Sequence, residues 1–151
     1  MAPPDLDAVI DLQWALNQFE DNITHDRVTD RESSRLCVED NLANTMAAGG
    51  ATLVAEAESS VIGYLSLVFK AGEPFVRPDK RSHGYVQDIV VNAEYRGNGV
   101  AQLLLAEAER VAKDAGLSGL ALGMLRGNVT AERAYVRFGF HPHSIELIKR
   151  F

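Results

Sequence analysis

The stretch Tyr95-Arg96-Gly97-Asn98-Gly99-Val100-Ala101 joins a predicted strand to a predicted helix. The segment before it, 85–91, is short and rich in β-branched residues, which is typical of a buried strand. The segment after it repeats apolar residues at helical spacing as far as Gly116, a residue type that commonly ends helices. A glycine turn at such a junction leaves backbone N–H groups unpaired at the positive end of the helix dipole. The stretch therefore predicts a phosphate site whose glycines let a ligand approach the backbone closely.

The glycines of this stretch do not by themselves identify a type of phosphate site. A Gly-x-Gly between a strand and a helix can be no more than a tight turn. It is not a P-loop, because no Gly-Lys-Ser/Thr follows, and the third glycine of a dinucleotide fingerprint is missing after Gly97-Asn98-Gly99. A second cluster further along the chain favours a more specific interpretation.

That cluster is Asn128-Val129-Thr130-Ala131-Glu132-Arg133-Ala134-Tyr135-Val136-Arg137-Phe138-Gly139-Phe140. Together with the segment 96–101, it resembles the two motifs of the GNAT superfamily of N-acetyltransferases. The first family motif is Arg/Gln-x-x-Gly-x-Gly/Ala, and the second contains an Asn, an Ala, a Tyr and a Gly-Phe pair. The order of the predicted elements is also similar, and the resemblance extends over nearly the whole chain from about Asp5.

Composition places the chain among ordinary soluble globular proteins, with 151 residues, 46% apolar and 24% charged. We expect one domain spanning residues 1–151. No apolar run approaches the roughly 20 residues that cross a bilayer, and the N-terminus lacks a signal-peptide pattern. The lone Cys37 cannot form an internal disulfide, which fits a reducing compartment. We therefore expect a cytoplasmic protein without a membrane partner.

Charge is distributed unevenly within the net charge of −6. Residues 1–60 hold 12 acidic and 3 basic side chains, whereas residues 61–151 hold 9 acidic and 12 basic ones. This asymmetry suits a cationic acceptor on one side and a phosphate-bearing cofactor on the other, although a solvated acidic helix surface explains it equally well. No basic stripe with interleaved aromatic residues is present, so we expect no nucleic-acid partner.

Hydrophobic periodicity and turn residues predict helices over 5–20, 31–48, 98–115 and 130–138, strands over 51–57, 61–69, 85–91, 117–125 and 143–150, and a loop over 71–82. The resemblance implies an α/β (α+β) fold with a mixed, mostly antiparallel central sheet flanked by helices. Family members usually begin with a strand before the first helix. Here that strand is either absent or reduced to the few residues around Ala2–Pro4.

The resemblance implies acetyl transfer from acetyl-CoA to a primary amine. It assigns the pyrophosphate to the helix start, made of Arg96, Gly97, Asn98, Gly99, Val100, Ala101 and Gln102. The pantetheine arm would lie along the backbone of Ile89, Val90 and Val91, where the N–H of Ile89 or Val91 would polarise the thioester carbonyl. Asn128 would bind the cofactor or the adjoining backbone, with a simple helix cap as its alternative role. Tyr135 would donate a proton to the leaving thiolate, unless it is a packed aromatic residue of the core.

The general base is harder to assign. Many relatives carry a Glu at the position of Gln87, and an amide cannot accept a proton at neutral pH. Asp88 is the candidate base, although strand alternation would point it to the opposite face unless a bulge intervenes. His83 and His25 are further candidates, and ordered waters can also carry the proton away.

The resemblance implies an acceptor site opposite the cofactor, built from the first two helices, the 71–82 loop and the last strands. Acidic candidates for holding an ammonium group are Glu20, Asp21, Asp26, Asp30 and Glu32, and aromatic candidates are Phe75, Trp14 and Phe19. We expect no metal site, because the pair His141 and His143 lacks a supporting ligand at suitable spacing.

The expected partner is therefore a small molecule that bears an amine. The alternatives are a protein N-terminal or lysine acetyltransferase, a catalytically degenerate acyl-CoA-binding regulator, and a different nucleotide-binding α/β protein. The resemblance also admits a homodimer, which family members often form through their last strands.

Overall fold

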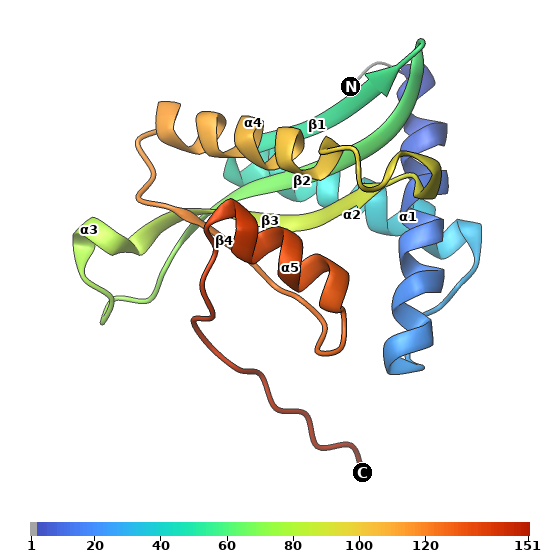
Figure 1. The fold of residues 1–151 in the computed structure, drawn as a ribbon. Coiled ribbons are helices and arrows are strands. Elements are labelled where there is room, and N and C mark those ends of the chain that lie inside the picture. Colours follow the sequence, from blue (N-terminus) through green and yellow to red (C-terminus); the bar gives the residue numbers. More distant parts are fainter. Residues whose placement is uncertain (1–2) are drawn as a thin grey trace.

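The structure is a computed structural model that describes residues 3–151 (Figure 1). Its elements in chain order are α1 (Pro3–Thr24), α2 (Arg31–Ala48), β1 (Gly50–Ala57), β2 (Ser60–Ala71), α3 (Pro78–Arg81), β3 (Ser82–Val91), the 3-10 turn η1 (Ala93–Tyr95), α4 (Val100–Asp114), β4 (Leu120–Leu122) and α5 (Val129–Phe138). The helices α1 and α2 cover one face of the sheet, and α4 covers the other (Figure 1).

The sheet has the order β1-β2-β3-β4. Its first two pairings are antiparallel and the pairing of β3 with β4 is parallel, so the predicted mixed, mostly antiparallel sheet is confirmed. The parallel pairing covers Gly84 to Val86 opposite β4, whereas β3 itself continues to Val91. One edge of β3 is consequently left without a neighbouring strand over the segment 87–91.

Two hydrophobic clusters hold the layers together. Leu104, Leu105 and Ala108 of α4 pack against buried residues of β2 such as Leu65 and Leu67. On the other face, buried side chains of α1 and α2 pack against the sheet; this second cluster contains Val9, Ile10, Leu12, Val38, Tyr64 and Val90. Burying a large apolar side chain contributes about 1.5–3 kcal/mol, so these two clusters fix the helices on the sheet.

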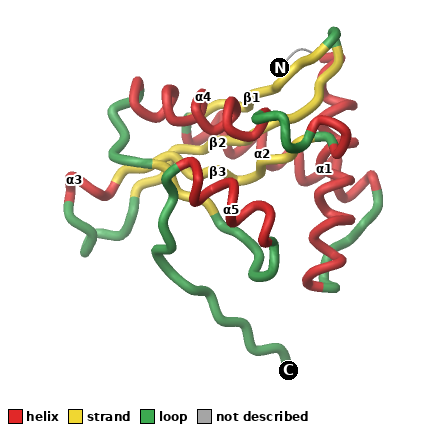
Figure 2. The backbone as a smooth tube through the Cα atoms, viewed as in Figure 1, coloured by secondary structure: helices red, strands yellow, loops and turns green. Residues whose placement is uncertain are grey.

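The predicted closing strand over 143–150 is wrong. Residues 141–151 have no helix or strand and run away from the sheet as an extended tail (Figure 2). The large apolar side chains of this tail are exposed at 70–110% of their maximum, namely Ile145, Leu147, Ile148 and Phe151. A strand requires a neighbour to pair with its backbone, and the tail lies beside no strand.

The ends of the sheet differ in length from what the sequence predicts. The strand predicted over 117–125 is shortened to Leu120–Leu122, between Gly119 and Gly123, which weaken a strand. Within residues 3–151 no strand precedes α1, so the first strand is absent from the described chain; Ala2, included in the reduced alternative, lies outside it. In the same described part, no helix is long and apolar enough to cross a membrane.

Candidate active site

A cleft of about 740 Å³ opens where β3 continues past the end of β4. Its walls are β3, the glycine turn, the start of α4, α5 and the C-terminal part of α1. The predicted site residues that line it are Asp88, Ile89, Val90, Val91, Arg96, Gly97, Gly99, Val100, Ala101, Gln102, Asn128 and Tyr135. Asn98 does not line the cleft; its amide folds back onto the turn, donating to Tyr95 O at 3.3 Å.

The free edge of β3 presents backbone groups to this cleft. Asn92 N donates to Ile62 O at 2.8 Å. Because hydrogen-bonded residues alternate along an antiparallel strand, Val90 and Asp88 also direct their backbone N–H and C=O groups toward β2. Ile89 and Val91 alternate with these residues and direct their N–H and C=O groups outward. Arg96 Nε donates to Val91 O at 3.0 Å, which agrees with this orientation. The edge can therefore pair with the amides of an extended ligand.

The glycine turn leaves room for an anion at the start of α4. Gly97 and Gly99 have φ of +79° and +83°, and a Cβ at either position would have nothing within 4 Å. Leu103 N donates to Gly99 O at 3.1 Å, the first bond of the helix. The N–H groups of Val100, Ala101 and Gln102 therefore have no carbonyl of the helix to bind, and they lie at the positive end of the helix dipole. This arrangement fits a pyrophosphate.

The helix α5 forms the opposite wall. The Oδ1 atom of Asn128 accepts from Ala131 N at 3.1 Å, so its side chain caps the helix. Gln102 Nε2 donates to Ala134 O at 3.0 Å and ties α5 to α4. The half-buried Tyr135 ring meets Phe140 edge-on, with the ring centroids 6.0 Å apart. Burial, followed by the negative charges of Glu20 and Asp88, raises the pKa of the Tyr135 phenol to about 12.

A β-bulge changes which way Asp88 faces. Ser66 lies opposite Asp88 and Leu67 opposite Val86, so Gln87 is an extra residue in β3. Both Gln87 and Asp88 consequently reach Asn41 on α2: Asn41 Nδ2 donates to Asp88 Oδ2 at 2.5 Å, and Gln87 Nε2 donates to Asn41 Oδ1. Strict alternation would point Gln87 and Asp88 to opposite faces of the sheet. The bulge makes this expectation wrong, because both side chains reach the same helix.

Asn41 bonds to two residues of the cleft, and the sequence pattern did not single it out. It is buried, and it follows the buried Val38 by three positions on the inward face of α2. A polar residue at an apolar helical position was the signal that could have found it.

The surroundings of Asp88 shift the pKa of its carboxyl upward. Burial raises the pKa of this carboxyl, and the hydrogen bond from Asn41 offsets part of that rise. Glu20 also raises the pKa, whereas Arg27 lowers it. These two side chains form an ion pair with 3.0 Å between Arg27 Nε and Glu20 Oε2, and both line the cleft.

The other predicted acceptor residues divide between the cleft and the surface. Glu20 and Phe19 line the cleft. The remaining acids have local partners instead: Asp21 accepts from Arg27 N, Asp26 pairs with Arg150, Asp30 caps α2 and Glu32 pairs with Arg35. Trp14 Nε1 donates to Thr29 O at 2.6 Å, and Phe75 is 87% exposed in the loop before α3.

Neither histidine proposed as a base is among the residues that line the cleft. The Nδ1 atom of His83 lies 3.3 Å from Arg81 O, and His25 follows α1 with a φ of +55°. Asp88 is therefore the candidate base that the structure brings into the cleft.

Comparison with known families settles what kind of protein has this cleft. The model of the acetyltransferase (GNAT) family matches residues 6–140. The chain belongs to the GNAT acetyltransferase family. Acetyl-CoA is the cosubstrate of GNAT acetyltransferases, and the free β3 edge and the glycine turn of this GNAT protein fit its amides and its pyrophosphate.

Several solved structures share the fold of this GNAT protein. The aminoglycoside acetyltransferase AAC(6')-Iy, in complex with a CoA-containing bisubstrate analogue, aligns with a TM-score of 0.74 and 18% identity over 100% of this chain and 94% of that chain. AAC(6')-IG from Acinetobacter haemolyticus aligns at 0.70 and 18% identity, over 100% and 96%. A protein named as a transcriptional regulator from Bacillus halodurans aligns at 0.76 and 17% identity, over 100% and 96%. At these identities the likeness establishes the fold, and a search of curated proteins gave no match.

Proposed function

We propose that this protein transfers the acetyl group of acetyl-CoA to a primary amine on a small cationic molecule. The observation that carries the proposal is the composition of one cleft. A free strand edge, a helix start suited to an anion, a phenol and a half-buried carboxyl all face the same space. Each can serve one step of acetyl transfer from a CoA thioester to an amine.

The backbone supplies most of the binding. The N–H groups of Val100, Ala101 and Gln102 bind phosphate oxygens, and the outward groups of Ile89 and Val91 pair with the amides of the pantetheine arm. Bound acetyl-CoA supplies an activated thioester. An outward N–H of β3 then donates to the carbonyl oxygen and stabilises the negative charge that develops there.

Two side chains manage the protons. The amine attacks in its neutral form, and Asp88 accepts the proton that the nitrogen loses as the amide bond forms. The raised pKa of Asp88 brings it closer to neutral pH, where a base is most effective. Tyr135 keeps its proton at neutral pH, because its pKa lies near 12. A thiol titrates near about 8.5, so complete transfer from this phenol to the thiolate is uphill. Tyr135 therefore stabilises the leaving sulfur by donating a hydrogen bond to it, and CoA departs as a thiolate that takes its proton from solvent.

The acidic side chains of the cleft support a cationic acceptor. Glu20, Asp88 and Glu146 line the cleft together with four arginines, Arg27, Arg96, Arg133 and Arg137. Arg27 is paired with Glu20, and Arg96 belongs to the glycine turn, where the phosphates are expected. Asp88 and Glu146 therefore remain to attract a positively charged amine. Two of the structural neighbours are named as aminoglycoside acetyltransferases, so aminoglycosides belong in the panel of acceptors to be tested. Polyamines, amino acids and peptides with a free N-terminus or lysine complete it.

The first experiment is a thermal shift with acetyl-CoA, with CoA, NAD and ATP as comparison ligands. A ligand at about 100 times its Kd stabilises the native state by roughly 2.7 kcal/mol, which is several degrees for a domain of this size. We expect a shift with acetyl-CoA and CoA and none with NAD or ATP. Release of free thiol in the presence of each amine then measures turnover. Absence of any shift at millimolar acetyl-CoA would refute the proposal.

One observation favours a second candidate, an acyl-CoA-binding regulator without turnover. The family resemblance implies a Glu at the position of Gln87, whose amide cannot act as a base. One structural neighbour is named as a transcriptional regulator. A thermal shift with acetyl-CoA but no thiol release with any amine would favour this candidate over the enzyme.

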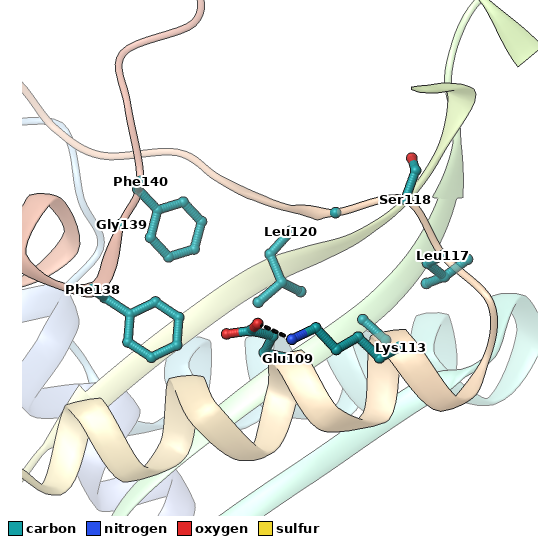
Figure 3. Close-up of a pocket in the computed structure, with 10 residues that line it drawn as sticks. Glu109, Lys113, Leu117, Ser118, Leu120, Phe138, Gly139 and Phe140 are labelled. Atoms are coloured by element: carbon teal, nitrogen blue, oxygen red, sulfur yellow. Dashed lines mark ion pairs between the residues drawn. The ribbon is translucent and has the colours of Figure 1, made fainter. Parts of the chain in front are cut away.

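We also propose a homodimer in which the tail of one copy, residues 141–151, pairs with β4 of the other. In the described chain β4 pairs with β3 alone, so its outer edge is unpaired. Beside that edge lies a cavity of about 340 Å³ into which Leu120, Phe138 and Phe140 point (Figure 3). The tail alternates Ile145 and Leu147 with polar residues, as a half-buried strand does. Pairing would cover apolar surface that one copy leaves exposed.

A further inference from the structure

The two neighbouring side chains Gln87 and Asp88 are joined by a single buried amide. Gln87 Nε2 donates to Asn41 Oδ1, and Asn41 Nδ2 donates to Asp88 Oδ2. These bonds fix the Asn41 amide in one orientation, with its oxygen toward Gln87 and its nitrogen toward Asp88. The chain of donors therefore runs from Gln87 through Asn41 to the carboxylate.

This chain requires a donor at position 87. A carboxylate there would accept hydrogen bonds and donate none at neutral pH. The Asn41 amide would then turn its nitrogen toward residue 87 and leave its oxygen facing the oxygen of Asp88. Two facing acceptors repel each other, and Asp88 would lose its buried partner. The amide of Gln87 thus keeps the Asn41 side chain in the orientation that lets it donate to Asp88.

We propose, on the basis of the acetyltransferase function above, that Gln87 and Asn41 are positioning residues for Asp88. Together they hold the Asp88 carboxylate at the cleft, ready to accept the proton of the attacking amine. The bulge at Gln87 makes this arrangement possible, because it turns two successive side chains toward the same helix. The base of this chain accordingly stands one residue beyond the strand position that carries a Glu in many relatives.

Other titratable groups near Asp88 can affect a measurement of its pKa. Glu20 and Arg27 face it from the α1 side of the cleft, Cys37 from α2, Tyr64 from β2 and Tyr135 from α5. The pKa of each of the last three is raised, to about 11 for Cys37, so all three are neutral at physiological pH. Glu20 and Arg27 offset each other as an ion pair.

Gln87→Glu is the deciding variant, because the proposal and the family pattern predict opposite results. We expect kcat/KM to fall by about 10²-fold, the usual contribution of a positioned base. The acidic limb of the pH profile should move to higher pH, because a second carboxylate favours the protonated form of Asp88. The Kd for acetyl-CoA, measured by calorimetry, should stay within a factor of about two. Activity equal to or above that of the natural chain would overturn the proposal.

Two companion variants separate positioning from general effects of charge or folding. Asn41→Asp is nearly the same size, still accepts from Gln87, but cannot donate to Asp88; the same loss and the same shift of the acidic limb are expected. Gln18→Glu adds an equal charge at an exposed position of α1 and should change neither quantity. A normal pH profile for Asn41→Asp would contradict the role of Asn41.

A readout independent of turnover distinguishes failure of this inference from failure of the proposed function. The pKa of Asp88 can be followed by carbon NMR of its carboxyl in the natural chain and in both variants. We expect it to rise in Gln87→Glu and in Asn41→Asp. An unchanged pKa would refute the inference even if the protein acetylates amines. Absence of turnover in the natural chain would refute the function and leave the NMR result to decide the positioning.

Discussion

Gly99 combines two properties that a side chain would disturb in different ways. Its φ of +83° places it in the left-handed region at the start of α4, where a residue with a Cβ is strained by roughly 1–2 kcal/mol. The space beside it is open, so a side chain there would meet the ligand before it met the protein. Stability and ligand binding can therefore be separated at this one position.

Gly99→Asp should abolish acetyl-CoA binding, because it sets a negative charge and extra bulk against the phosphates. Gly99→Ala is the matched control, since it introduces the same backbone strain without the charge. We expect the alanine variant to lose no more than about tenfold in affinity, equivalent to about 1.4 kcal/mol. Calorimetric titration with acetyl-CoA measures both. Normal binding by Gly99→Asp would show that the turn does not hold the pyrophosphate.

Tyr135→Phe tests the phenol without changing the packing against Phe140. We expect kcat to fall by about 10²-fold and the Kd for acetyl-CoA to remain unchanged, because the hydroxyl acts on the departing sulfur. Steady-state thiol release measures the first quantity and calorimetry the second. Tyr85→Phe is the control: this tyrosine also lines the cleft, but its ring lies under Lys70 at 3.7 Å. Equal kcat for Tyr135→Phe and the natural chain would remove Tyr135 from the mechanism.

Residues whose role depends on the backbone were predictable from sequence, whereas those defined by side-chain direction were less so. Gly97, Gly99 and Val100 were expected at the site for their backbone, and all three line the cleft. Tyr135 was expected from the family motif, and it also lines the cleft. Asn41 was missed, and the orientation of Asp88 was left conditional on a bulge. Both depend on the register between β2 and β3, which arises from pairing across the sheet and leaves no local mark in the sequence.

Helices were predicted more accurately than strands, and their capping residues show why. The helix α2 spans Arg31–Ala48, as predicted; Asp30 accepts from Ser33 N at 2.6 Å at one end, and Gly49 ends it with a φ of +80°. Those signals lie within the chain segment itself. The tail over 141–151 has a strand-like pattern but no strand beside it, because pairing depends on a partner that the pattern does not specify.

Asn128 connects the end of α5 to the cleft, and two substitutions can separate its roles. Asn128→Ala should lower stability by about 1 kcal/mol through loss of the cap, whereas Asn128→Ser retains a capping oxygen. We expect serine to restore the melting temperature but not the affinity for acetyl-CoA, because a hydroxyl is shorter than the amide that reaches the cleft. Full recovery of both by serine would mean that Asn128 is a cap alone.

At the scale of the whole molecule, the extended tail sets the expected assembly. We expect light scattering after gel filtration to give twice the chain mass of 16.5 kDa. The double substitution Ile145→Ser and Leu147→Ser should yield a monomer, because both side chains share one face of the tail when it pairs as a strand with the other copy. Ile148→Ser, on the other face, is the matched control and should leave the dimer intact. A natural chain that stays monomeric at every concentration would contradict this assembly.

The two walls of the cleft come from different parts of the chain. Acetyl-CoA is assigned to the backbone of β3 and α4, whereas Glu20, Phe19 and Arg27 line the cleft from α1 and the segment that follows it. In the proposed function, the cosubstrate is therefore bound mainly by backbone atoms, which all residue types share, and the acceptor is bound in part by side chains on a separate helix. Over evolution, substitutions along α1 and its following segment can change which amine is accepted while the acetyl donor stays the same. The chain can therefore keep its specificity for the acetyl donor while its specificity for the amine changes.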